Sequence, residues 1–127
     1  MQKIADYAAI KYNSRSIRKD NMGNMGITQR ENEILNRSID ILKKYLDPHL
    51  IILFGSRVKQ KYPEHADFDL AIDKEKIDIR LERRLKEEIE EVSGLYKVDI
   101  VFLNAVDKSF KDIILKTGRV VYGRKDD

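Results

Sequence analysis

The sequence predicts an α/β (α+β) domain built on a small mixed β-sheet, with helices mainly on one face. Three amphipathic segments of helical period alternate with four short segments of strand type. Their order is helix, strand, turn, strand, helix, strand, helix, strand, which favours one sheet covered by its helices. The length of 127 residues and the hydrophobic content of 42% suit one domain with a modest core.

Each predicted helix begins at a residue that can cap it. Residues 29 to 46 follow a capping box, because Thr28 and Glu31 can each satisfy a free backbone N–H group. Asp78 can cap the second helix and Asp107 the third. Their apolar stripes are Leu35, Ile39, Leu42 and Leu46 in the first, Leu81, Leu85, Ile89 and Val92 in the second, and Phe110, Ile113 and Ile114 in the third.

Four segments have the composition of strands. Residues 50 to 54 form a continuous apolar run, which is typical of a strand buried on both faces. Residues 67 to 73 and 97 to 103 alternate between apolar and other side chains, so each is predicted to bury one face. Residues 120 to 122 form a short last strand.

Carboxylates are predicted to gather on the open face of this sheet. Asp67 and Asp69 would share a face, because strand side chains switch sides at every residue. If the two alternating strands are neighbours, Asp99 joins them. Clustered carboxylates repel one another unless a cation lies among them, and oxygen ligands without His or Cys suit Mg²⁺ or Mn²⁺.

A Gly-Ser turn directly follows the apolar strand. Gly55 would let the backbone approach a phosphate closely, and Ser56 supplies a hydroxyl group. The N–H groups of a helix beginning there would favour anions. Each feature alone is common, whereas the turn, the carboxylate pair and the third carboxylate together predict a site for phosphate chemistry.

Read together, the turn, ten further residues and the carboxylate pair match the GS-x10-DxD pattern of the polymerase-β-like nucleotidyltransferase superfamily. Asp99 stands where its third carboxylate is expected. The small size and residues 110 to 122 resemble the minimal nucleotidyltransferases, and the resemblance covers residues 28 to 123. One departure is Ala66, where relatives frequently have Ser; we expect little consequence, since the ligand residues remain.

The resemblance implies a polymerase-β-like fold and transfer of AMP from ATP to an acceptor hydroxyl. It assigns the nucleotide phosphates to Gly55, Ser56 and Arg57. It assigns catalysis and two metal ions, Mg²⁺ or Mn²⁺, to Asp67, Asp69 and Asp99, with Asp99 helping to deprotonate the acceptor. Two such ions would stabilise both the attacking and the leaving oxygen.

The resemblance also implies a partner. Minimal nucleotidyltransferases are often encoded beside a HEPN-domain ribonuclease toxin and act as its antitoxin, and the acceptor would be a tyrosine of that toxin. A chain this short would need a partner or an oligomer to complete the acceptor site. Two alternatives stay open: an antitoxin that acts by binding alone, and a small-molecule nucleotidyltransferase of the aminoglycoside-modifying kind.

The amino-acid composition bears on the cellular compartment of the protein. Without cysteine there are no disulfides or thiolate metal sites, which is compatible with the cytoplasm. No apolar run is long enough to span a membrane, and no signal-peptide pattern begins the chain.

The net charge of +3 lies entirely in the N-terminal segment. Residues 1 to 25 contain five of the 25 basic and two of the 22 acidic side chains, so the remainder is neutral. A nucleic-acid partner is therefore not expected, because such domains carry positive charge on the folded part. Residues 1 to 25 are predicted to be a flexible extension. Alternatively, the chain starts at Met22 or Met25. Residues 26 to 127 are predicted to form the domain.

Overall fold

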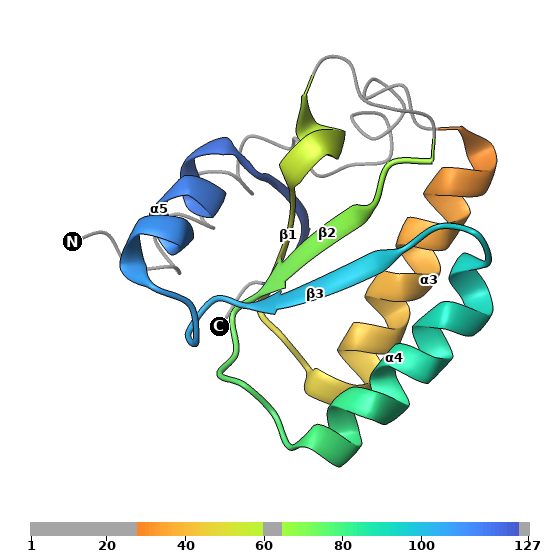
Figure 1. Ribbon diagram of the computed structural model, residues 1–127, viewed down its shortest axis with the longest axis horizontal. Coiled ribbons are helices and arrows are strands. Elements are labelled where there is room, and N and C mark those ends of the chain that lie inside the picture. Colours follow the sequence, from red (N-terminus) through yellow and green to blue (C-terminus); the bar gives the residue numbers. More distant parts are fainter. Residues whose placement is uncertain (1–27, 60–64, 125–127) are drawn as a thin grey trace.

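The fold is known from a computed structural model that describes residues 28–59 and 65–124 (Figure 1). One mixed sheet has the strand order β3-β2-β1-β4. Strand β1 pairs antiparallel with β2 and β4, whereas β2 and β3 run parallel. The strands are β1 (Leu50–Phe54), β2 (Phe68–Ile72), β3 (Val98–Phe102) and β4 (Arg119–Gly123).

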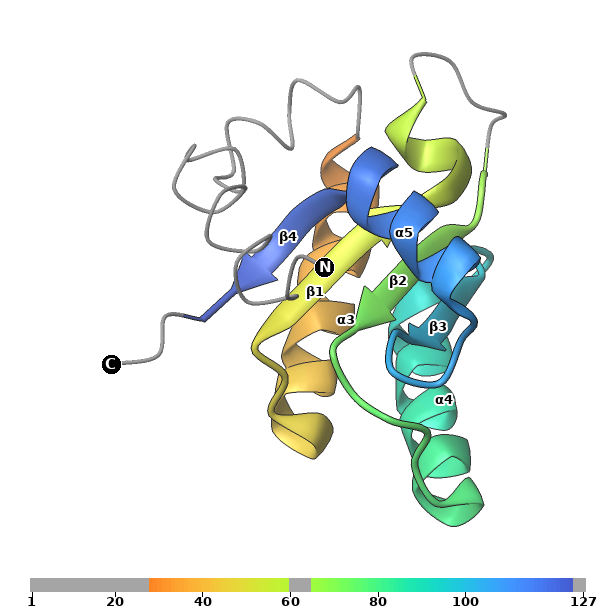
Figure 2. The same ribbon diagram turned by 90° about the vertical axis from the view of Figure 1, so that its left-hand side faces the viewer.

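Two helices cover one face of the sheet and a third lies on the other. Helices α3 (Gln29–Leu46) and α4 (Ile79–Ser93) pack side by side on the first face, and α5 (Lys108–Thr117) crosses the second (Figures 1 and 2). The predicted arrangement of helices mainly on one face is thus confirmed. The fully buried side chains of the larger core include Ile34, Leu35, Leu42, Ile51, Leu53, Phe68, Leu70, Ile72 and Leu85.

The caps predicted from sequence form at all three helix starts. Thr28 and Glu31 make both halves of the capping box, since each side chain accepts a hydrogen bond from the other residue's backbone N–H. The Asp78 carboxylate accepts from the N–H of Arg80, and the Asp107 carboxylate from that of Phe110. Local side-chain chemistry therefore fixes where each helix begins.

The two ends of the alternating segment differ from the prediction. Strand β2 begins at Phe68, so Asp67 lies just before the strand and not within it. Asp73 lies beyond the strand, where its Oδ1 accepts hydrogen bonds of 3.0 and 3.1 Å from the N–H groups of His49 and Leu50. Asp73 is thus a structural residue at the end of the sheet remote from the Gly-Ser turn.

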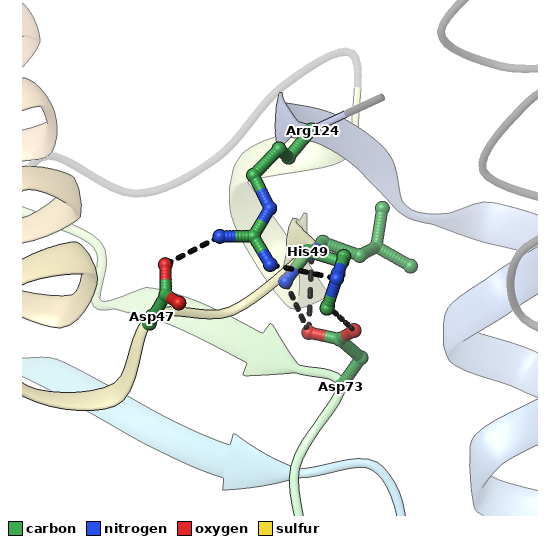
Figure 3. A network of polar contacts seen from close by, with 5 residues as sticks. Asp47, His49, Asp73 and Arg124 are labelled. Atoms are coloured by element: carbon green, nitrogen blue, oxygen red, sulfur yellow. Dashed lines mark hydrogen bonds and ion pairs between the residues drawn. The ribbon is translucent and has the colours of Figure 1, made fainter. Parts of the chain in front are cut away.

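A polar network closes that remote end (Figure 3). Arg124, directly after β4, binds Asp47 at 2.5 Å and lies 2.7 Å from Nε2 of His49. His49 in turn lies 3.7 Å from Asp73 through Nδ1. The network ties the end of β4 to the connection between α3 and β1.

One expectation falls outside the described residues, and another is tested only within them. The extension predicted at residues 1 to 25 lies wholly among residues that the structure does not describe, so its boundary with the domain stays a prediction. None of the helices in the described part of the chain combines the length and apolar character that crossing a bilayer would require.

Candidate active site

Asp69 lies at the centre of a row of side chains that crosses three strands. It is the cross-strand partner of Phe54 on β1 and of Asp99 on β3. Residues directly opposite one another on neighbouring strands have their side chains on the same face. The condition for bringing Asp69 and Asp99 together, that their strands are neighbours, is therefore met.

The face that holds this row is partly covered, not fully open. It is the α5 face, because Ala71, two residues after Asp69, packs beneath Ile114 and Leu115 of α5. Asp67, Asp69 and Asp99 are all partly exposed. Helix α5 thus forms one wall beside the carboxylates and leaves them in contact with solvent.

Gly55 brings the Gly-Ser turn against the Asp69 carboxylate. Its φ of +78° is in the left-handed region that favours glycine. A Cβ atom added at Gly55 would lie 2.4 Å from Oδ2 of Asp69. The absence of a side chain is therefore what allows the turn and the carboxylate to approach.

The environment of Asp69 disfavours its negative charge. Burial raises the pKa of Asp69 above its usual range, and the nearby carboxylates of Asp99 and Asp67 raise it further, while Lys97 acts in the opposite direction. Lys97 also pairs with Asp99 across 3.7 Å. A cation bound near Asp69 would relieve the repulsion among the three carboxylates.

The donor set fits a hard cation in chemistry but is not a closed site in this conformation. Carboxylate oxygens are the ligands that Mg²⁺ and Mn²⁺ favour. Within residues 28–59 and 65–124, however, no three acidic or histidine side chains are grouped closely enough to hold an ion. Asp67 lies outside the strand, and Asp99 pairs with Lys97. Asp69 is the carboxylate whose pKa is affected by Asp67, Asp99 and Lys97 together.

The sequence predicts that a helix begins at the Gly-Ser turn, and the helix found there is short. Gly55–Val58 form a single 3₁₀ helix, which ends as the Lys59 N–H donates to the carbonyl oxygen of Ser56. Ser56 remains partly exposed beside Gly55. The exposed turn thus offers a hydroxyl group next to the carboxylates, without a full α-helix behind it.

Arg57 occupies a different place from the one that the resemblance assigned to it. The residue is 1% exposed, and its guanidinium group donates through Nε and Nη2 to the carbonyl oxygen of Ala66, at 2.9 and 2.7 Å. Nη1 pairs with Oε2 of Glu31 at 2.5 Å. Its guanidinium group points into the protein, whereas a side chain that binds phosphate at the surface would point outward.

Aromatic rings complete the surroundings of Arg57. The guanidinium carbon lies 3.9 Å from the ring centroid of Phe68 and 5.5 Å from that of Tyr96. Arg57 therefore joins the start of α3, the Gly-Ser turn and the residue before Asp67. The bond at Ala66 uses only the backbone carbonyl oxygen, so it does not depend on the side chain at this position.

Sequence reasoning missed Lys97 and the aromatic neighbours of the site. Lys97 directly precedes the strand that holds Asp99. Residues two positions apart in an extended segment share a face, so the sequence could have indicated that Lys97 lies beside Asp99. Phe54 was read only as part of a buried strand, although its position opposite Asp69 follows from strand pairing.

Comparison with known proteins gives concordant results. The family model for polymerase beta nucleotidyltransferases matches residues 36–127. A Haemophilus influenzae protein named probable protein adenylyltransferase MntA is 34% identical over 82 residues, which make up 64% of this chain and 72% of that protein.

Solved structures resemble the fold. A toxin–antitoxin complex with AMP-PNP has a TM-score of 0.60 at 22% identity, over 71% of this chain and 73% of that chain. A Shewanella oneidensis complex of a tri-AMPylated HEPN toxin with an MNT antitoxin has a TM-score of 0.56 at 21% identity, over 75% of this chain and 73% of the other. At these identities the likeness shows a shared fold.

Proposed function

The chain belongs to the polymerase beta nucleotidyltransferase family, and from this premise we propose that it transfers AMP from ATP to an acceptor hydroxyl. The observation that carries the proposal is the position of Asp69. Its carboxylate lies where a Cβ atom at Gly55 would collide with it, and Asp69 is the cross-strand partner of Asp99. The Gly-Ser turn, Asp69 and Asp99 thus adjoin one another, which supports the proposed phosphate, metal and acceptor positions.

The residues of the site are proposed to bind different parts of the nucleotide and its metal ion. Gly55 and Ser56 would hold the β and γ phosphates, through close backbone approach and a hydroxyl group. Asp67 and Asp69 would hold Mg²⁺, or Mn²⁺ in its place. Bound there, the ion supplies charge neutralisation at the reacting phosphate.

Asp99 is the group proposed to receive the acceptor proton. Its oxygen would take that proton as the acceptor oxygen bonds to the α-phosphorus and the bond to the leaving pyrophosphate breaks. Asp99 is partly exposed and lies on β3, the edge strand of the sheet, which leaves room for an acceptor. Nζ of Lys97 lies 3.7 Å from Oδ1 of Asp99 and pairs with this carboxylate.

Arg57 is proposed to act on the site indirectly. By binding the Ala66 carbonyl, its guanidinium holds the residue before Asp67 at a fixed place beside the Gly-Ser turn. The bond joins Arg57, directly after the Gly-Ser turn, to Ala66, directly before Asp67. Arg57 is thus a positioning residue and not a nucleotide ligand.

The acceptor proposed for this chain is a tyrosine of a HEPN-domain toxin, in the cytoplasm. The relative named an adenylyltransferase and the complex of an AMPylated HEPN toxin support this choice. An antitoxin acting by binding alone is the second candidate, and a small-molecule acceptor the third. A purely binding role leaves unexplained why Asp69 keeps a charge that its surroundings disfavour.

The ribonuclease activity of the HEPN-domain toxin proposed as the partner of this chain distinguishes these candidates. We expect a catalytic amount of this chain to silence the ribonuclease only when Mg²⁺ and ATP are present. The intact mass of the toxin should rise by whole AMP groups. Silencing that needs equimolar protein and no ATP would favour the binding antitoxin, and an unmodified, active toxin would favour the small-molecule acceptor.

Gly55→Ala tests the approach of the turn to Asp69. The new Cβ would collide with Oδ2 of Asp69, so the carboxylate or the turn must move. Because misplacement by about 1 Å can cost about 10²-fold in rate, we expect a kcat loss of that order in AMP transfer.

Gly94→Ala is the matched control for this variant. Gly94 also has a positive φ, of +60°, but a Cβ there would meet Nη2 of Arg30 at an ordinary contact distance of 3.6 Å. Both variants should therefore show backbone strain as a lowered Tm, whereas only Gly55→Ala should lose turnover. Equal turnover in the two variants would contradict the proposed contact.

A further inference from the structure

An aromatic pair stands beside the carboxylates on the α5 face. Phe54 ends β1, directly before Gly55, and is the cross-strand partner of Asp69. Phe110, in the first turn of α5, contacts it edge to face, with ring centroids 5.9 Å apart and an angle of 79° between the planes. We call Phe54 and Phe110 the aromatic ledge.

The ledge is accessible, although the helix that carries part of it is well anchored. Ile114 and Leu115 are 0% and 7% exposed and hold α5 on the sheet, whereas Phe110 is 37% exposed. The large apolar side chains exposed in the described part of the chain are Ile79, Leu95, Phe110 and Ile113. Phe110 is the aromatic one of these, and it contacts the strand that leads into the Gly-Ser turn.

We propose that the aromatic ledge binds the adenine ring of ATP, an inference that rests on the proposed function. The row across the sheet runs Asp99, Asp69, Phe54, from β3 to β1. The acceptor is expected at the Asp99 end, where its proton is removed. The ledge lies on the opposite side of Asp69, next to the turn that takes the phosphates, and this favours the nucleotide over the acceptor as its ligand.

The chemistry of the ledge suits a nucleobase. Purine rings stack on aromatic side chains, and an edge-to-face pair leaves ring surface available for a further planar group. Stacking is tolerant of base identity, because every base has an aromatic face. The ledge therefore predicts affinity for the base of a nucleoside triphosphate, without strong selection among bases.

Calorimetric titration of ATP and of inorganic triphosphate, each with Mg²⁺, tests this assignment. Phe110→Ala should raise the Kd for ATP about 5- to 150-fold, the range that stacking of one base on an aromatic ring accounts for, and leave the Kd for inorganic triphosphate unchanged. Phe110→Tyr keeps the ring and should bind ATP as the wild type does. Ile113→Ala, at an exposed position one turn further along α5, is the control.

Each outcome separates the ledge from the proposed function. Wild-type affinity for ATP in Phe110→Ala would overturn the ledge and leave adenylyl transfer untouched. An equal loss of ATP and inorganic triphosphate would show a distorted site and also overturn it. A raised KM for the acceptor with an unchanged Kd for ATP would assign Phe110 to the acceptor. Wild-type protein that binds neither compound would contradict the proposed function itself.

Discussion

Asp69→Asn should lower the kcat of AMP transfer about 10²- to 10³-fold, the usual loss when one preorganised electrostatic contact is removed from a reacting centre. The substitution keeps the shape of the side chain and removes its charge. Asp69 lies beside Gly55 and opposite Asp99, so in the proposed mechanism the binding of both the phosphates and the acceptor depends on it. Steady-state kinetics at saturating ATP would measure the loss, and near-wild-type turnover would contradict the mechanism.

The same substitution should stabilise the protein when no metal is bound. The pKa of Asp69 is raised by burial and by Asp99 and Asp67, so it lies above the value in the unfolded chain. The stability that its protonation provides is full below the unfolded pKa and is lost as the pH rises through the folded pKa. Above the folded pKa the ionised carboxylate therefore costs stability, and an amide does not.

Thermal unfolding in EDTA checks this second effect. Asp69→Asn should have a higher Tm than the wild type at pH 7, and the difference should shrink at about pH 3, where an Asp side chain is largely protonated in both states. Asp40→Asn, at an exposed position on α3, should show no such gain. A lower Tm for Asp69→Asn at pH 7 would show that carboxylate repulsion is not the dominant influence on Asp69.

Arg57→Met should destabilise the fold by about 3–5 kcal/mol, because it leaves a buried carboxylate without its partner. Glu31 is 6% exposed, and its Oε2 lies 2.5 Å from Nη1 of Arg57. Burial alone would raise the pKa of Glu31, but hydrogen bonds from Thr28 and Arg57 lower it overall. Urea unfolding would measure the loss. A change below about 1 kcal/mol, the level of a surface pair, would contradict the buried arrangement.

Matched variants separate this buried pair from a surface one. Arg124 also pairs with a carboxylate at 2.5 Å, but its side chain is 36% exposed and that of its partner Asp47 is 76% exposed. Arg124→Met should therefore cost only about 0–1 kcal/mol. Removing Glu31 as well as Arg57, as Glu31→Gln with Arg57→Met, should recover part of the loss, since no unpaired buried charge remains.

Activity distinguishes positioning by Arg57 from stability alone. Arg57→Lys keeps a positive charge but lacks the fork that reaches both Ala66 and Glu31. At a temperature where this variant is fully folded, we expect its kcat to fall, because the residue before Asp67 is no longer held. A direct phosphate contact would instead raise the KM for ATP, and that result would restore the role that the family resemblance assigned.

The fold could be predicted because its determinants are local. The Thr28–Glu31 capping box and the alternation around Asp69 each act over a few residues, and the structure contains both. The pairing of Asp69 with Asp99 needed only that two predicted strands be neighbours. Helix α5 also formed as expected, but the periodicity of its side chains did not reveal that it covers the face of the carboxylates.

The contacts of Arg57 could not be predicted in the same way. Its contacts are with Glu31 and Ala66, 26 and 9 residues away, and they exist only once α3 and the turn are packed together. Seen in the sequence, an arginine after Gly-Ser suggests a phosphate ligand. The contact between Phe54 and Phe110 likewise depends on how α5 crosses the sheet.

The most direct test of adenylyl transfer is the position of the label that reaches the acceptor. The purified protein, Mg²⁺ and the HEPN-domain toxin proposed as its acceptor would be incubated in parallel with ATP labelled at the α or at the γ phosphorus. Label on the acceptor from α-labelled ATP only is the expected result, with γ label released in pyrophosphate. Label from the γ position would make the protein a kinase and contradict AMP transfer.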